Sequence, residues 1–150
     1  MLIIGIGNPD CGDDAAGILV ARRLAERGVE AVQHRSGTLN LIDLWDTAEN
    51  VVIADAVVSG VARGEVQVWD VCTTSLRNGV FRSCTHEFGL AEAVELARAL
   101  NRLPKTLIIY GIEAANFVPG TRPCSRVLAG VDRVVTEIYS RVNHRRPGHA

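Results

Sequence analysis

Two patterns of apolar and polar positions alternate along the chain. Short, nearly uninterrupted apolar runs, such as Asn50–Ala56 and Lys105–Gly111, are typical of strands in a parallel sheet that is covered on both faces. Longer segments repeat apolar residues at intervals of three and four, which predicts helices with one buried side. The patterns predict strands at residues 1–6, 29–33, 50–56, 64–71 and 105–111, and helices at residues 14–27, 39–47, 85–100 and 125–142. We therefore expect an α/β fold, a three-layer sandwich with helices on both faces of a largely parallel, twisted sheet.

Length and composition suggest how the chain is divided. A chain of 150 residues suits one domain, and no linker rich in proline, glycine or serine interrupts it. We expect a single α/β domain over residues 1–142. Residues 143–150 are polar and contain proline and glycine, so we expect them to form a frayed tail. In the segment 64–71 three valines, among them Val68, alternate with polar residues, which predicts a half-exposed edge strand.

The overall charge limits the classes of partner. Sixteen basic and seventeen acidic residues give a net charge of −1, which offers no electrostatic case for binding nucleic acid or an acidic membrane surface. The apolar runs are far shorter than a membrane span. The four cysteines are scattered without a CxxC pair, and no basic segment precedes the first strand. We expect a cytoplasmic monomer with reduced thiols.

The turn after the first strand contains the first candidate chemistry. It reads GIGNPDCGDDAAG and brings Asp13 and Asp14 to the start of the first helix, where two carboxylates would repel a phosphate and attract a cation. Asp55 closes the central strand, and His86 lies near the start of the third long helix. Ligands of open α/β sheets bind beyond the carboxyl ends of the strands, so we expect these groups at one edge of the sheet. Two carboxylates and an imidazole form a mixed set that leaves positions open on a metal ion.

Each of these residues also has a plainer explanation. Asp13 or Asp14 at a helix start is often an N-cap or a favourable partner of the helix dipole, and Asp55 after a strand can fix the next turn through an Asx hydrogen bond. His86 can be a surface residue. Cys11 lies close to the acidic pair as a candidate fourth ligand, although nothing else selects it. The convergence of the acids and the histidine on one sheet edge favours the metal interpretation.

Several competing motifs are incomplete. The dinucleotide fingerprint GxGxxG fails because Asp10 occupies its last glycine position, and a P-loop lacks its lysine because the only lysine is Lys105. Neither the GxSxG elbow of serine hydrolases nor the HExxH motif of zinc proteases occurs. Cys84 is close to His86 in sequence and is a conceivable nucleophile, but this proximity does not ensure contact.

Three segments of the chain resemble a known family. GIGNPDCGDDAAG, VVIADAVVSG and THEFGL are similar to the three signature regions of the hydrogenase maturation endopeptidases, in the same order. That family trims the C-terminal extension from the large subunit of nickel–iron hydrogenases. The resemblance implies that Asp14, Asp55 and His86 are the catalytic and metal-contacting residues. It also implies that they engage nickel carried by the partner, the large-subunit precursor, so that cleavage waits for metal insertion.

The chain departs from the family pattern at two places. Asp14 stands where many relatives have glutamate, which shortens the reach of the carboxylate by one bond. Arg35 and the three residues after it stand where relatives tend to show Asp-Gly-Gly-Thr, so the cleft would accept a different substrate tail. Two other functions stay open at this point. One is a non-catalytic, metal-sensing or chaperone-like module that binds the precursor without cutting it, and the other is a small-molecule-binding α/β protein that uses the turn at residues 5–12.

Overall fold

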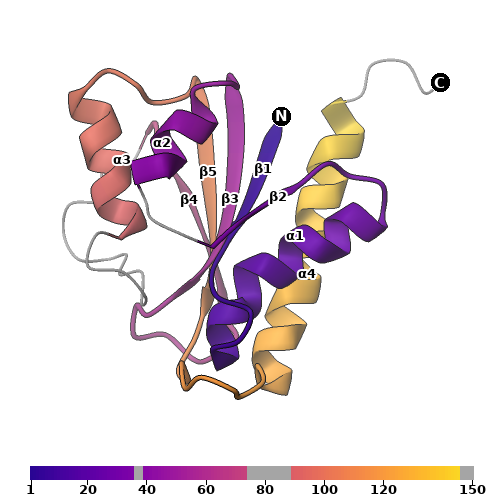
Figure 1. Cartoon of the computed structure of the whole chain (residues 1–150). Coiled ribbons are helices and arrows are strands. Elements are labelled where there is room, and N and C mark those ends of the chain that lie inside the picture. Colours follow the sequence, from indigo (N-terminus) through magenta and orange to yellow (C-terminus); the bar gives the residue numbers. More distant parts are fainter. Residues whose placement is uncertain (36–38, 74–88, 146–150) are drawn as a thin grey trace.

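One sheet lies between two layers of helices in the computed structural model, which describes residues 1–35, 39–73 and 89–145 (Figure 1). The strands in these residues are β1 (Leu2–Ile6), β2 (Val32–His34), β3 (Asn50–Val57), β4 (Val66–Asp70) and β5 (Thr106–Glu113). The helices are the short 3₁₀ helix η1 (Gly12–Ala15), α1 (Ala16–Glu26), α2 (Leu39–Trp45), α3 (Leu90–Ala99) and α4 (Ser125–Arg145). The expected α/β sandwich is confirmed.

The longest apolar strands occupy the middle of the sheet, whose strand order is β2-β1-β3-β5-β4. β3 and β5 run parallel over eight residues each, from the pair Asn50 and Thr106 to the pair Val57 and Glu113. β1 pairs in parallel with both β2 and β3, whereas β4 is antiparallel to β5. The sheet is therefore largely parallel, with one antiparallel strand at its edge, as expected for residues 64–71.

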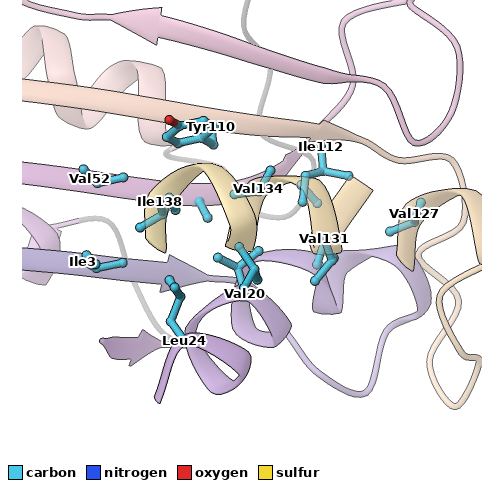
Figure 2. Packing of buried hydrophobic residues seen from close by; sticks show 14 of the residues in the cluster. Ile3, Val20, Leu24, Val52, Tyr110, Ile112, Val127, Val131, Val134 and Ile138 are labelled. Atoms are coloured by element: carbon cyan, nitrogen blue, oxygen red, sulfur yellow. The ribbon is translucent and has the colours of Figure 1, made fainter. Parts of the chain in front are cut away.

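Each face of the sheet has its own apolar core. Because successive side chains of a strand point to opposite faces, Ile53 and Val57 of β3 pack under α2 and α3, and Val52 and Ala54 pack under α1 and α4. Figure 2 shows the second of these cores, where side chains from the strands meet those of α1 and α4. Its labelled members are Ile3, Val20, Leu24, Val52, Tyr110, Ile112, Val127, Val131, Val134 and Ile138.

Helix α1 approaches the sheet more closely than a side chain would allow. A Cβ atom placed on Gly17 would lie 2.2 Å from the carbonyl oxygen of Ile6 and 2.4 Å from that of Ala54. Only glycine can occupy this position without moving the helix. The first turn of α1 therefore sits directly on the boundary between β1 and β3, and this contact fixes where the chain entering the helix must lie.

The structure corrects several boundaries. The predicted strand at residues 29–33 begins only at Val32, because the amide of Val29 donates to the carbonyl of Leu24 and closes the C-terminal cap of α1. The predicted tail is partly wrong, because α4 continues through Arg145. The predicted half-exposed edge strand is confirmed as β4, where the side chain of Val68 is 46% exposed because the strand covers the core only in part. Residues 85–88 of the predicted third helix, and residues 146–150 of the tail, lie outside the described residues.

Among the residues that the structure describes, no helix is long and apolar enough to cross a membrane.

Candidate functional site

The charged side chains buried in the described part of the chain gather at one end of the sheet. They are Asp13, Asp14, Asp55 and Glu113, with exposed fractions between 0 and 4%. Asp13 and Asp14 lie in η1 just after β1, whereas Asp55 and Glu113 lie in the last three residues of β3 and β5. Burying a carboxylate is costly unless hydrogen bonds or opposite charges compensate for lost hydration. Four at one edge therefore mark a region with a specific role.

This edge coincides with the topological switch point of the sheet. The chain leaves β1 to form β2 on one side and later returns to form β3 on the other side. Ligands of open α/β sheets bind in the crevice that such a reversal leaves beyond the carboxyl ends of the strands. Asp14 follows β1 and Asp55 belongs to β3, so the two carboxylates flank this point.

The close packing of α1 brings these two acids to the same place. Gly17 lies against the carbonyl of Ala54, the residue before Asp55, and Asp14 lies three residues before Gly17. The 3₁₀ helix η1 packs against β3 as a consequence. One carboxylate oxygen of Asp14 accepts a hydrogen bond from the amide of Asn8 at 3.0 Å. The structure therefore places two of the three predicted site residues at the same end of the sheet, each about 1% exposed.

The third predicted residue, His86, lies outside the described residues, as does Cys84. Within the described residues no group of three or more histidine, cysteine, aspartate or glutamate side chains is arranged to hold a metal ion. Cys11 is half-buried at the N-cap of η1. Its role as a fourth ligand stays a prediction.

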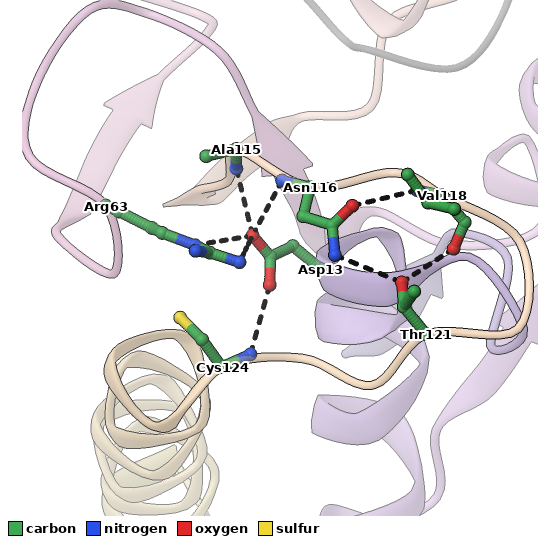
Figure 3. Close-up of polar contacts among 7 residues, drawn as sticks. All are labelled: Asp13, Arg63, Ala115, Asn116, Val118, Thr121 and Cys124. Carbon is green, nitrogen blue, oxygen red and sulfur yellow. Dashed lines mark hydrogen bonds and ion pairs between the residues drawn. The ribbon is translucent and has the colours of Figure 1, made fainter.

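Asp13 has a different environment from its neighbour Asp14 (Figure 3). Its Oδ2 atom accepts hydrogen bonds from the amides of Ala115 (2.9 Å) and Asn116 (3.1 Å), and its Oδ1 atom accepts one from the amide of Cys124 (3.2 Å). The guanidinium of Arg63 contacts the same Oδ2 through Nε at 2.8 Å and through Nη2 at 2.7 Å. One fully buried carboxylate thus joins η1 to two loops that lie far apart in sequence.

These donors also determine the ionisation of Asp13. Burial is the largest single influence and would raise the pKa of the carboxyl, because it disfavours the charged form. The three backbone amides and Arg63 favour the charged form, and together they hold the pKa below the ordinary value of 3.8. Asp13 is therefore an anionic anchor at neutral pH.

A second set of contacts shapes the loop between β5 and α4. The side chain of Asn116 donates to Thr121 Oγ1 at 3.1 Å and accepts from the amide of Val118 at 3.1 Å. The loop also contacts the turn after β1, because the amide of Gly120 donates to the carbonyl of Asp10 at 2.7 Å. Figure 3 shows the contacts among Asn116, Val118 and Thr121 beside Asp13. The turn and the loop therefore form one hydrogen-bonded unit.

Glu113 plays a comparable part on the neighbouring loop. Its carboxylate accepts from the amides of Ser59 and Gly60, both at 2.9 Å, and from the hydroxyl of Ser59 at 2.8 Å. These contacts hold the start of the segment that connects β3 to β4. The sequence pattern alone singles out neither Glu113 nor Arg63. Glu113 carries the same signal as Asp55, an acid at the end of a buried strand.

The cap explanation of Asp13 and Asp14 and the turn explanation of Asp55 are wrong, whereas both acids of the pair do lie in the first turn of η1, where the helix dipole favours negative charge. The N-cap of η1 is Cys11 and that of α1 is Ala15, so neither Asp13 nor Asp14 caps a helix. Asp55 does not begin a turn, because β3 continues to Val57.

Fold and site together define an α/β protein with an acidic site at its switch point, suited to a cationic ligand. A family model described as hydrogenase maturation protease matches residues 19–141 of this chain. The chain belongs to the hydrogenase maturation protease family, as its three signature segments indicated.

Two curated relatives agree with this assignment. The hydrogenase expression/formation protein HupM of Azotobacter chroococcum is 27% identical over 122 residues, which cover 78% of this chain and 58% of HupM. HoxM of Azotobacter vinelandii, described in the same words, is 25% identical over 118 residues, which cover 75% of this chain and 57% of HoxM. The chain thus spans less than two thirds of the length of these relatives.

Solved structures have the same fold. The NiFe hydrogenase maturation protease HybD from Thermococcus kodakarensis superposes with a TM-score of 0.75 at 30% identity, covering 94% of this chain and 97% of HybD. The hydrogenase maturating endopeptidase HybD from E. coli gives a TM-score of 0.73 at 20% identity, with coverage of 95% and 91%. The second likeness shows the fold alone.

Proposed function

We propose that this protein is an endopeptidase that removes the C-terminal extension of the large-subunit precursor of a nickel–iron hydrogenase. The family assignment supports the reaction class. The observation that carries the proposal is the pair of buried carboxylates, Asp14 and Asp55, at the switch point of the sheet. The two acids lie where ligands of open α/β sheets bind, and carboxylates are suitable ligands for a cation presented by the substrate.

In this proposal the metal belongs to the substrate. Nickel that has already been inserted in the precursor would be contacted by Asp14 and Asp55, with His86 as the third group. Carboxylate and imidazole groups both suit divalent nickel, and an incomplete set of ligands allows a metal held by another protein to be approached. A metal held there can polarise the carbonyl to be cut or a water molecule. The contribution of this chain is to hold the two carboxylates in a fixed position beside the metal.

The structure gives no support to the small-molecule alternative. A phosphate cradle needs open backbone amides, whereas the amides of Gly7, Gly12 and Asp13 already donate to the carbonyls of His34, Thr121 and Asn116. A Cβ on Gly7 would also lie 2.0 Å from the carbonyl oxygen of Asp14, so this glycine serves the close packing of η1 on the end of β1. The non-catalytic module would use the same acidic site, so only a measurement of cleavage separates it from the endopeptidase.

The test is the intact mass of a candidate precursor, nickel-loaded and nickel-free, before and after incubation with this protein. We expect a C-terminal peptide to be lost from the nickel-loaded form alone. Cleavage of both forms would refute the nickel requirement. Binding without any change in mass would favour the non-catalytic module.

Variants then test the residues. Asp14→Asn and Asp55→Asn preserve side-chain size and remove the negative charge, so we expect each to abolish cleavage while the protein stays folded. His86→Ala tests the third group. Asp132→Asn is the matched control, because Asp132 is an exposed aspartate on α4 whose partner is Arg23. Normal cleavage by both Asp14→Asn and Asp55→Asn would show that the assigned site is wrong.

The proposal also includes the setting of the reaction. We propose that the protein acts as a monomer in the cytoplasm, where thiols stay reduced. The three cysteines that the structure describes, Cys11, Cys72 and Cys124, are free, as that compartment favours. Light scattering of the purified protein tests the monomer, and fractionation of cells tests the compartment.

A further inference from the structure

Two loops border the acidic site at the carboxyl ends of the strands, and we call them the rim loops. One is the segment 58–65 between β3 and β4, and the other is the segment 114–124 between β5 and α4. They carry three of the large apolar side chains that the structure exposes, Val58, Val61 and Val118, which are 41, 36 and 57% exposed. Exposed apolar side chains on loops around a site that receives a protein add apolar contact area to it.

A single side chain holds both rim loops. Asp13 accepts three backbone amides from the segment 114–124 and pairs with Arg63 of the segment 58–65. Its own segment, η1, also carries Asp14, so the position of the rim is fixed relative to the acidic site. Charge-assisted hydrogen bonds are about twice as strong as neutral ones, and these are shielded from water because Asp13 is fully buried.

We propose that Asp13, acting through Arg63, is a positioning residue for the precursor. It holds the rim loops in the arrangement that receives the protein substrate beside Asp14. This inference rests on the proposed function, because it names the same substrate. Asp13 itself touches neither the substrate nor the bond to be cut.

The physical basis is preorganisation. A loop that is ordered only when the partner binds loses conformational entropy at that moment, and the loss weakens binding. Loops that are already held by Asp13 avoid this loss. Releasing one of these loops should therefore weaken the binding of the precursor, while the rate of cleavage within the bound complex stays nearly unchanged.

Arg63→Met is the variant that tests this, because it keeps an unbranched apolar stem and removes the charged guanidinium group. Replacing Asp13 itself risks misfolding, since the side chain is fully buried. Arg23→Met is the matched control. The side chains of Arg23 and Arg63 are both 32% exposed and both pair with an aspartate, but Arg23 pairs with Asp132, between α1 and α4.

Three quantities are measured for each protein: kcat and KM for the nickel-loaded precursor, and Kd for the nickel-free precursor. For Arg63→Met we expect KM and Kd to rise about tenfold while kcat stays within about twofold. Arg63→Lys should recover most of the affinity, and Arg23→Met should match the wild type. Hydrogen exchange should accelerate in Arg63→Met alone at the amides of Gly64 and Glu65, which belong to the rim loop that Arg63 ties to Asp13.

The outcomes separate this inference from the proposed function. If the wild type binds the precursor without cutting it, the endopeptidase proposal fails while the Kd comparison still tests the positioning role. If Arg63→Met is folded and its KM and Kd equal those of the wild type, the positioning role is refuted. A fall in kcat without a change in KM or Kd would also refute it.

Discussion

Replacing Gly17 with alanine tests how the sheet fixes the acidic site. The added Cβ would lie 2.2 Å from the carbonyl oxygen of Ile6 and 2.4 Å from that of Ala54, where an ordinary contact begins near 3.4 Å. Both contacting atoms belong to the backbone of strands in the middle of the sheet, so they have no rotamer that relieves the clash. The start of α1 must therefore move outward by about 1 Å, and Asp14 must move with it away from Asp55.

The free energy of this change has two opposing parts. Alanine is better than glycine in the interior of a helix by about 1 kcal/mol. Overpacking typically costs about 1–3 kcal/mol, and the upper part of that range applies here because rigid backbone must yield. We expect a net loss of about 2 kcal/mol in the free energy of unfolding. For a domain of this size the melting temperature should fall by about 4–8 °C.

The effect on activity should exceed the effect on stability. A displacement of about 1 Å at a catalytic site can lower the rate about 100-fold. Cleavage of the nickel-loaded precursor should therefore fall by about this factor in Gly17→Ala at a temperature where the variant is folded. Ala25→Gly is the control, because it weakens the exposed side of the same helix by about 1 kcal/mol without moving its start. A Gly17→Ala variant with unchanged melting temperature and activity would refute the reasoning.

Three further predictions follow from the same structure. Glu113→Ala should lower the free energy of unfolding by about 1–3 kcal/mol, because the amides of Ser59 and Gly60 lose their acceptor. Glu113→Gln should lower it by less than about 1 kcal/mol, because the glutamine amide can still donate to the Ser59 hydroxyl. Urea denaturation of the two variants and the wild type compares these free energies. Burial raises the pKa of Tyr110 above its usual 10, although Arg141 opposes this, so the contribution of the phenol to stability is complete below pH 10 and is lost as the pH rises through the raised pKa. Tyr110→Phe should therefore be less stable than the wild type by about 1 kcal/mol at pH 7, with the difference in melting temperature narrowing above pH 10. Treating this protein with a chelator and then removing the chelator should leave processing of nickel-loaded precursor unchanged, and a loss restored by added nickel would show that the metal is resident.

The main features of the fold are predictable from the sequence because the signals of its elements are strong. β3 and β5 are long apolar runs that only a sheet covered on both faces can bury. Helix α4 has a clear apolar side, and its extension to Arg145 was missed because polar residues end a hydrophobic pattern without ending a helix. Val29 was misassigned for a similar reason. It is apolar and buried, but it closes the cap of α1 rather than extending β2.

The site was predictable only in part. Asp14 and Asp55 follow or end strands whose carboxyl ends must meet, so topology alone places them together. The role of Asp13 was not predictable, because its partners come from residues 63, 115, 116 and 124, far along the chain. Sequence spacing describes contacts within an element, whereas these contacts depend on how two loops fold back over the end of the sheet.

Asp13 and Asp14 are adjacent in the 3₁₀ helix η1, but their side chains have different partners and therefore different roles. The carboxylate of Asp13 accepts hydrogen bonds from amides of the rim loop 114–124. The carboxylate of Asp14 accepts one from the amide of Asn8, in the turn that follows β1 at the switch point. The contact of Gly17 with β1 and β3 fixes α1, α1 fixes η1, and η1 fixes both aspartates. The rim that we propose to receive a protein substrate and the carboxylates that we propose to contact its metal are thus set by one short segment. A change in that segment should alter substrate binding and cleavage together, whereas a change in Arg63 should alter binding alone.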